Sequence, residues 1–230
     1  MPIHFDAAGL TVEAPDGERV VLEPTTAALV EQRIGVIGAN GSGKSTLARM
    51  INGLVVPSTG RVRVDGYDVA RHGREVRRRV GFCFTDPAAQ LVMPTCVEDV
   101  ELSLRRTVKD ARARHERALA VLADHGLSEH ADVSVHALSG GQKQLLALAG
   151  VLAVEPAVLV ADEPTTLLDL ANTRRVADLL FGLDQQLVLV THDLELARRC
   201  DRVLVVADAA VRYDGPADAA VDHYLASVTA

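Results

Sequence analysis

Five runs of apolar residues, two before position 96 and three after position 152, predict strands of a buried sheet. Each run spans four or five residues: Ile34–Ile37, Val80–Phe84, Val158–Ala161, Leu187–Val190 and Val203–Val206. Near-continuous rather than alternating apolar runs are typical of strands covered on both faces, as in parallel sheets. Between the third and fourth runs, Val176, Leu179 and Leu180 have helical spacing, so this part is predicted to form a strand–helix–strand unit.

Shorter or alternating apolar stretches predict antiparallel strands in the first third of the chain. Ile3–Leu22 contains short apolar stretches separated by the turn sequence Ala14–Gly17. Arg61–Tyr67 alternates polar and apolar residues and includes Asp65-Gly66, a dipeptide typical of hairpin turns. We therefore predict two hairpins that form an antiparallel edge of the core.

The middle third of the chain has helical periodicity instead. From Cys96 to Leu152, apolar residues recur at intervals of three and four. We predict an α-helical subdomain at 88–152, inserted into a core formed by 1–87 and 153–230. The segment Pro216–Ala230 is predicted to form a short amphipathic helix that packs on this core. The predicted fold class is α/β, with a mostly parallel sheet, an antiparallel β edge and an inserted helical subdomain.

Composition and charge narrow the classes of protein that fit. With 230 residues, 48% of them apolar, the chain can bury a full hydrophobic interior. The longest unbroken apolar run, Leu145–Val154, is too short to cross a bilayer, and no cleavable leader is recognisable, so a cytoplasmic location is expected. The net charge of −7 argues against nucleic acid as the principal partner. Three cysteines without metal-ligand spacing are expected to be buried, reduced thiols: Cys83, Cys96 and Cys200.

A glycine-rich segment between the first apolar run and a helical pattern carries the most specific chemistry. It fits G-x-x-x-x-G-K-[ST], a loop whose backbone N–H groups meet phosphate oxygens at a helix N-terminus. Gly41 and Gly43 are expected to adopt positive φ, Lys44 to place a charge near the β and γ phosphates, and Ser45 to ligate Mg²⁺. The predicted ATP-binding residues are Gly38, Ala39, Asn40, Gly41, Ser42, Gly43, Lys44, Ser45 and Thr46. The helix that follows is predicted to bury Leu47, Met50, Ile51 and Leu54.

Two carboxylates follow the apolar run at 158–161. Ligands of open α/β sheets gather at the carboxyl ends of the strands, which is where Asp162 and Glu163 are placed. Such a pair is common as a simple strand end, but the upstream phosphate loop favours a chemical role. Asp162 is predicted to hold Mg²⁺, and Glu163 to orient or deprotonate the attacking water.

The segment Leu138–Gln142 has two possible explanations. Ser139 followed three residues later by Gln142 is a capping box for the apolar helix that follows. However, each glycine in the first turn weakens a helix by up to about 1 kcal/mol relative to alanine. Gly140 and Gly141 therefore indicate that bare backbone is needed there, as it would be where a helix N-terminus receives an anion.

Taken in order, these motifs resemble the nucleotide-binding subunits of ATP-binding cassette (ABC) systems along essentially the whole chain. The segments that carry the resemblance are Gly38–Thr46, Leu138–Gln144 and Val160–Thr166. The resemblance implies a P-loop NTPase fold with a RecA-like core, and hydrolysis of ATP with Mg²⁺ coupled to transmembrane transport. It also implies that two ATP molecules are sandwiched in a head-to-tail dimer. In that dimer the signature residues of one copy cover the nucleotide bound by the other; they are Ser139, Gly140, Gly141 and Gln142.

The same resemblance implies roles for two further residues. Asp169 matches the loop that crosses the dimer interface, although Leu167 stands where the family usually has a small residue. His192 matches the switch histidine that senses the γ-phosphate. Together with Lys44 and Glu163, His192 makes up the predicted catalytic set.

The segment Phe84–Leu91 points to a subfamily. It is similar to the Phe-Gln-x-Pro-x-x-Gln segment of ATPases from energy-coupling factor (ECF) importers of vitamins and metals. Thr85 replaces the Mg²⁺-contacting glutamine and can offer the metal one oxygen, whereas Gln90 matches the second glutamine and is expected to meet the membrane partner. The Phe-Thr-Asp-Pro variant looks most like the ATPases of biotin transporters, so biotin is the expected transported substrate.

The resemblance also implies partners and a location. The partners are a second ATPase chain, with an identical copy favoured over a paralogue, a transmembrane scaffold subunit and a substrate-binding membrane subunit. The chain itself is expected to lie peripherally at the cytoplasmic face of the membrane. Cobalt, nickel or another vitamin is the alternative substrate. A soluble ABC ATPase of translation or DNA repair is disfavoured because the chain has neither a second cassette nor a long coiled coil. A non-hydrolysing regulatory module is disfavoured because Glu163 and His192 are both present.

Overall fold

The computed structural model describes residues 1–15 and 17–229, and contacts group the chain into two compact units. The sheet unit contains Met1–Phe82, Ala157–Glu163 and Leu183–Ala230, and the helical unit contains Cys83–Pro156 and Pro164–Gly182. The main difference from the predicted division is that 164–182 groups with the helices rather than with the core.

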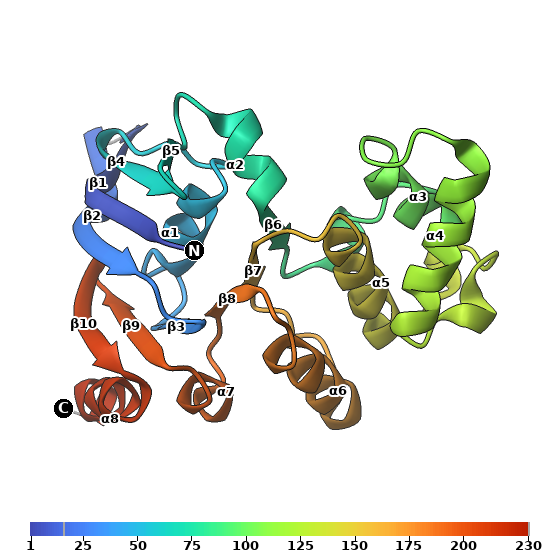
Figure 1. Cartoon of the computed structure of the whole chain (residues 1–230). Coiled ribbons are helices and arrows are strands. Elements are labelled where there is room, and N and C mark those ends of the chain that lie inside the picture. Colours follow the sequence, from blue (N-terminus) through green and yellow to red (C-terminus); the bar gives the residue numbers. More distant parts are fainter. Residues whose placement is uncertain (16, 230) are drawn as a thin grey trace. The chain divides into compact units, whose positions relative to one another are not determined.

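One sheet of the sheet unit is antiparallel, with strand order β2-β1-β4-β5. Its strands are β1 (Ile3–Ala14), β2 (Gly17–Leu29), β4 (Thr59–Val64) and β5 (Tyr67–Asp68), drawn in blue to cyan in Figure 1. The pairing of β1 with β2 and of β4 with β5 confirms the two predicted hairpins. In the first hairpin, the predicted turn residue Asp16 lies outside the described residues.

The second sheet of this unit is mixed, with strand order β10-β9-β3-β8-β7-β6. Its strands are β3 (Arg33–Ile37), β6 (Val80–Cys83), β7 (Val158–Asp162), β8 (Gln186–Val190), β9 (Arg202–Ala207) and β10 (Ala210–Pro216). Parallel pairing joins β9 to β3, β3 to β8 and β8 to β7. Every residue of β7 and β8 is buried, which confirms the reading of the continuous apolar runs.

The helix α1 (Lys44–Ile51) forms a layer between the two sheets, because it contacts β2 and β4 on one side and β7 and β8 on the other. Leu47, Met50 and Ile51 are buried as predicted. Leu54 is 47% exposed, so its predicted burial is wrong. The helix ends before it, and Gly53 reverses the chain with a φ of 71°.

Three further helices belong to the sheet unit: α2 (Gly73–Arg79), α7 (Leu194–Arg198) and α8 (Ala217–Thr229). The helix α8 lies against β9 and β10, as Figure 1 shows in red. Val221 is buried there, and the ring of His223 stacks on Tyr213 of β10 with centroids 4.9 Å apart. The C-terminal helix therefore packs on the core as predicted.

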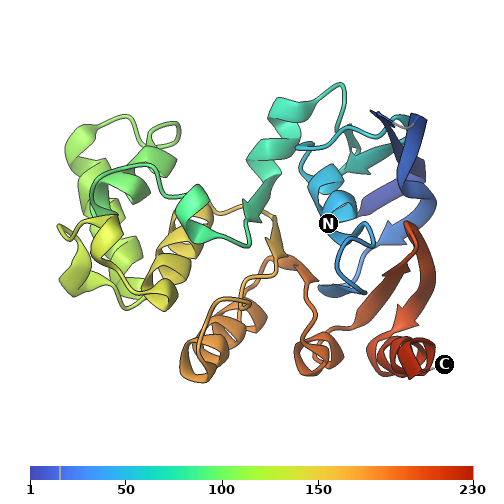
Figure 2. The ribbon, with the colours of Figure 1, turned by 180° about the vertical axis from the view of Figure 1, so that it is seen from behind.

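The helical unit contains four α-helices and three short 3₁₀ turns among its described residues (Figure 2). The helices are α3 (Cys96–Leu104), α4 (Ala111–Asp124), α5 (Gly140–Leu152) and α6 (Leu170–Phe181); the 3₁₀ turns are η1 (Pro87–Ala89), η2 (Ser128–His130) and η3 (Val135–Ala137). All three cysteines of the chain are free and buried, as predicted. Within the described residues, every helix falls short of the length and apolar character needed to cross a membrane.

Candidate functional site

The glycine loop follows β3 and leads directly into α1. Gly41 and Gly43 have φ values of 77° and 110°, which residues with a Cβ rarely adopt. At Gly38 the reason is steric, because a Cβ there would overlap the carbonyl oxygen of Val206 in β9. Glycine is therefore needed at these three positions of the loop, which lets the backbone follow the path that a cradle for phosphate oxygens requires.

Lys44 places its ammonium group inside this loop. The residue is 5% exposed, and Nζ donates to the carbonyl oxygens of Gly38 at 2.9 Å and Ala39 at 2.8 Å. Burial lowers the pKa of Lys44, while the negative charges of Glu163 and Asp162 act in the opposite direction. The cation thus lies where incoming phosphates would displace its carbonyl partners.

Asp162 ends β7 and is fully buried. Its Oδ1 accepts a hydrogen bond from Ser45 Oγ at 2.9 Å, while Oδ2 has no hydrogen-bond partner and lies 3.5 Å from the Arg49 guanidinium. Burial raises the pKa of the Asp162 carboxyl, and Ser45 and Arg49 counter the shift. A buried carboxylate oxygen without a hydrogen-bond partner, on the residue that also binds the Ser45 hydroxyl, fits Mg²⁺, which proteins bind through one or two carboxylates plus phosphates and water.

Glu163 and His192 form a close pair. Oε2 of Glu163 lies 2.7 Å from Nδ1 of His192, and the Glu163 side chain is only 13% exposed. Glu163 has a φ of 54°, an unfavourable conformation for a residue with a side chain. With Nδ1 engaged by the carboxylate, Nε2 is the nitrogen through which His192 can reach a phosphate. The sheet unit thus brings together the predicted residues of the loop, β7 and the end of β8.

The helical unit presents the predicted signature segment at the N-terminus of α5. Both halves of the capping box form: Ser139 Oγ accepts from the Gln142 backbone N–H at 3.3 Å, and Gln142 Oε1 accepts from the Ser139 backbone N–H at 2.9 Å. Ser139 and Gly140 are exposed. An exposed helix N-terminus with a hydroxyl and bare backbone can receive an anion.

The two glycines of this segment have different reasons to be glycine. A Cβ on Gly141 would overlap the side chain of Asn172 in α6, whereas a Cβ on Gly140 would find the nearest atom at an ordinary 3.7 Å. Asn172 is itself held by Asp169, which caps α6 by accepting from the Asn172 backbone N–H at 2.8 Å and from Nδ2 at 3.0 Å. Packing explains Gly141, so only Gly140 requires an explanation from ligand binding.

Gln90 and Thr85 lie in the segment that enters the helical unit. The Gln90 amide bridges two parts of this unit, because Oε1 accepts from the Phe84 backbone N–H at 3.2 Å and Nε2 donates to the Ala147 carbonyl at 3.4 Å. Thr85 lines a small pocket of about 150 Å³, together with residues from the start of α5 and from the segment before α6. Contact of Gln90 with a membrane partner stays a prediction, as does contact of Thr85 with the metal.

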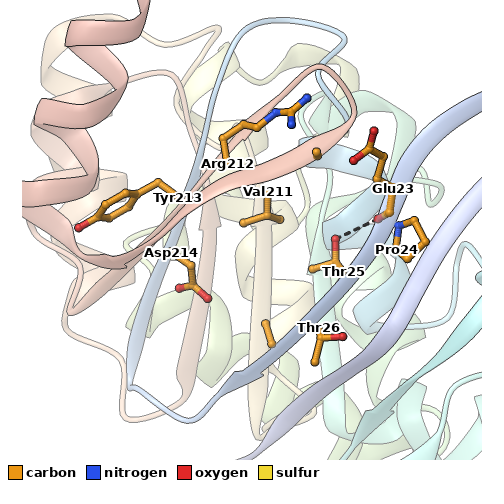
Figure 3. Close-up of a pocket in the computed structure, with 10 residues that line it drawn as sticks. Glu23, Pro24, Thr25, Thr26, Val211, Arg212, Tyr213 and Asp214 are labelled. Atoms are coloured by element: carbon orange, nitrogen blue, oxygen red, sulfur yellow. Dashed lines mark hydrogen bonds between the residues drawn. The ribbon is translucent and has the colours of Figure 1, made fainter.

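A groove of about 400 Å³ in the sheet unit lies elsewhere. It is lined by residues of β2 and β10, the edge strands of the two sheets, including Glu23, Thr25, Arg212 and Asp214 (Figure 3). The backbone N–H of Glu23 donates to the Ala209 carbonyl and links β2 to the turn before β10. None of the predicted site residues lines this groove, so we assign it no part in nucleotide chemistry.

Sequence reasoning missed two residues of these sites. Arg49 stands four residues after Ser45, so both occupy one face of α1; this spacing could have placed Arg49 near Asp162. Asn172 touches Gly141 from a different helix, and no periodicity or motif in the sequence links the two.

The glycine loop, the buried Asp162 and the parallel strands β9, β3, β8 and β7 of the mixed sheet define a P-loop nucleoside triphosphatase. The sequence pattern of the family described as "ABC transporter" matches residues 29–166. A "Putative ABC transporter ATP-binding protein" of Deinococcus radiodurans is 45% identical, over 92% of this chain and 94% of that protein. The "Biotin transport ATP-binding protein BioM" of Rhizobium etli is 43% identical, over 97% of this chain and 98% of that protein.

Solved structures agree in fold over nearly the whole chain. The dimeric ABC transporter cassette MJ0796 superposes with a TM-score of 0.84 at 29% identity, covering 94% of this chain and 98% of that one. The cbiO1 protein of Clostridium perfringens, part of the ABC transporter complex cbiONQ, superposes with a TM-score of 0.81 at 28% identity, covering 99% and 93%. The chain belongs to the ABC transporter family. It is an ATP-binding subunit of such a transporter, and it is an ATPase.

Proposed function

We propose that this chain is the ATP-hydrolysing subunit of an ECF-type importer and energises the uptake of biotin through separate membrane subunits. The observation that carries the proposal is likeness over essentially the full length to proteins named for biotin transport. These are the Rhizobium etli protein and a second one from Rhodobacter capsulatus, 39% identical over 98% of this chain. The variant segment Phe84–Pro87 supports the same subfamily.

In the sheet unit, each residue of the proposed catalytic set has one task. The loop at 38–46 binds the triphosphate of ATP, and Lys44 exchanges its carbonyl partners for phosphate oxygens. Ser45 and Asp162 hold Mg²⁺, which when bound neutralises phosphate charge. Glu163 accepts the proton of the attacking water or orients it, and His192, held by Glu163, contacts the γ-phosphate.

In the helical unit, we propose that Ser139, Gly140 and Gly141 complete the site of a second, identical chain. The exposure of Ser139 and Gly140 in the single chain supports this role. Leu167 and Leu170, which flank Asp169, are 67% and 66% exposed, and apolar side chains so exposed are typical of a surface that a partner covers. Asp169 would then cross the interface between the copies.

We further propose that Gln90 transmits the nucleotide state to a transmembrane scaffold subunit, with the chain bound peripherally at the cytoplasmic face. Its amide joins the segment after β6 to α5, so movement of either part would be passed to the surface around η1. Thr85 offers the metal one oxygen in place of the larger amide that the family has there.

The proposal is tested on the whole transporter. The tagged chain is expressed with the membrane proteins of its host, the complex is purified in detergent, and the co-purifying ligand is identified by mass spectrometry. We expect biotin, together with a scaffold subunit and a small substrate-binding subunit. A complex that carries another vitamin or a metal ion would refute biotin as the substrate, and recovery of ribosomes or DNA in place of membrane subunits would refute transport.

A further inference from the structure

The start of α5 is tied to a residue outside the signature segment. His130, the last residue of the turn η2, lies nine positions before Ser139 and is half-buried. Its Nε2 is 2.9 Å from Nε2 of the Gln142 amide. The other end of that amide, Oε1, accepts from the Ser139 backbone N–H at 2.9 Å.

The directions of these hydrogen bonds follow from one fixed group. A backbone N–H can only donate, so the amide oxygen of Gln142 must be the atom that faces Ser139. The amide nitrogen then faces His130, and because an amide nitrogen only donates, Nε2 of His130 must accept. The imidazole is therefore neutral, with its proton on Nδ1. A single consistent chain of donors and acceptors runs from Ser139 through Gln142 to His130.

We propose that His130 is a positioning residue for Ser139. By accepting from the Gln142 amide, it fixes the rotamer in which Gln142 holds the Ser139 backbone, and thereby sets where the Ser139 hydroxyl points. This inference rests on the proposed function, in which Ser139 contacts the phosphate bound by a second copy. Without the acceptor at position 130, the Gln142 amide can turn away and Ser139 loses its backbone partner.

The other ring nitrogen of His130 argues against a role in stability alone. Nδ1 is buried and has no hydrogen-bond partner. A buried polar group without a partner destabilises a fold, so an apolar side chain would serve packing better at this position. The benefit of the imidazole therefore lies at Nε2, in the contact with Gln142.

The test compares His130→Leu, which removes the acceptor, with His130→Gln, whose amide oxygen can replace Nε2. ATP turnover is measured on the purified chain, and ATP-driven dimerisation is measured by light scattering in the Glu163→Gln background. We expect His130→Leu to lower kcat and to weaken dimerisation by about five- to tenfold, with ATP affinity of the lone chain unchanged. His130→Gln should stay within about twofold of the parent chain. The matched control is His115→Leu, because His115 is also a histidine of the helical unit and its Nδ1 is hydrogen-bonded to the Glu101 side chain.

Two results would overturn the inference: dimerisation and turnover of His130→Leu equal to those of the parent chain, or equal losses in His130→Leu and His130→Gln. If His130→Leu is poorly folded, His130→Ala replaces it in a double-mutant cycle with Gln142→Ala, because a positioning role requires non-additive effects on turnover and additivity refutes it. Ser139→Ala separates the inference from the function on which it rests. If Ser139→Ala leaves turnover and dimerisation unchanged, the proposed role of Ser139 fails and the inference fails with it. If Ser139→Ala abolishes turnover while His130→Leu leaves it unchanged, only the inference fails.

Discussion

At the scale of single residues, the sheet unit contains several side chains in states that folding alone does not favour. Glu163 has a positive φ, Asp162 is a buried carboxylate with an oxygen lacking a hydrogen-bond partner, and Lys44 is a buried ammonium that donates to the loop's own carbonyls. Each state costs stability in the nucleotide-free protein. Phosphate oxygens would give Lys44 charged partners in place of the carbonyls, and a divalent cation would give the second oxygen of Asp162 a partner, so bound ligand would offset two of these costs. The backbone conformation of Glu163 is not relieved in this way.

Glu163→Gln is expected to lower ATP turnover by at least about 100-fold, because an amide cannot accept a proton from water. The side chain keeps its size, so nucleotide binding should persist. Turnover is measured by phosphate release and binding by nucleotide titration, with Glu195→Gln as a control that neutralises an exposed carboxylate in α7. Turnover near that of the parent chain would remove Glu163 from the catalytic set.

Asp162→Asn should stabilise the nucleotide-free protein at neutral pH by about 1 kcal/mol even though activity is lost. Burial is the largest cause of the raised pKa of Asp162, so the charged form is disfavoured in the fold. A carboxyl whose folded pKa lies above its unfolded value reduces stability at pH values above the folded pKa, and this cost disappears below the unfolded pKa. The gain from Asn should therefore shrink as pH falls towards about 4.

The measurement is thermal unfolding of both proteins in EDTA over a range of pH, with the exposed Asp132→Asn as control. If Asp162→Asn is the less stable protein at neutral pH, the hydrogen bond from Ser45 and the charge of Arg49 outweigh burial, contrary to the argument.

At the scale of elements, the signature segment depends on how closely α5 approaches α6. Gly141→Ala is expected to lower the free energy of unfolding by about 2 kcal/mol, because its Cβ overlaps Asn172. Gly140→Ala, one residue earlier, places its Cβ at an ordinary contact distance and should be neutral or stabilising by up to about 1 kcal/mol. Both are measured by urea unfolding. Asn172→Ala removes the overlapping atoms and should restore much of the loss, so a Gly141→Ala deficit that persists in the double variant would exclude this contact as the cause.

The elements that the sequence predicted are those with a strong periodic signal. β7 and β8 are buried on both faces, so each appears in the sequence as an unbroken apolar run. The glycine loop was predicted from a motif that lies between a strand and a helix. No prediction was made for β10 from the sequence. Among the described residues it is an edge strand that pairs with β9, and most residues of β10 are exposed or half-buried. Its segment Ala210–Pro216 therefore lacks an apolar run to detect.

The site could be predicted only where chemistry is local in the sequence. Lys44, Ser45 and the pair Asp162–Glu163 belong to short motifs, and the structure brings them together. The contacts of Asn172 with Gly141 join parts of the chain with no shared period. Contacts of this kind arise from packing between elements, which a one-dimensional pattern does not encode.

At the scale of the whole molecule, the proposed head-to-tail dimer requires each chain to supply two half-sites. Lys44 and its loop belong to the sheet unit, and Ser139 belongs to the helical unit. If the head-to-tail dimer is correct, one chain supplies the loop and the other the signature segment of every working site. The two halves can then be inactivated in different chains and tested by mixing.

Lys44→Ala and Ser139→Arg should each be inactive alone, the first for lack of phosphate binding and the second because a bulky cation fills the place of the hydroxyl. Mixed, they form a heterodimer in which the loop of the Ser139→Arg chain meets the intact signature of the Lys44→Ala chain. One site per heterodimer is then complete, so phosphate release should appear on mixing and rise with total protein concentration. The double variant Lys44→Ala/Ser139→Arg, mixed with either single variant, leaves no complete site and should stay inactive. The contrary outcome is that the mixed single variants stay inactive although light scattering detects dimers. The loop and the signature segment of different chains would then not share a nucleotide.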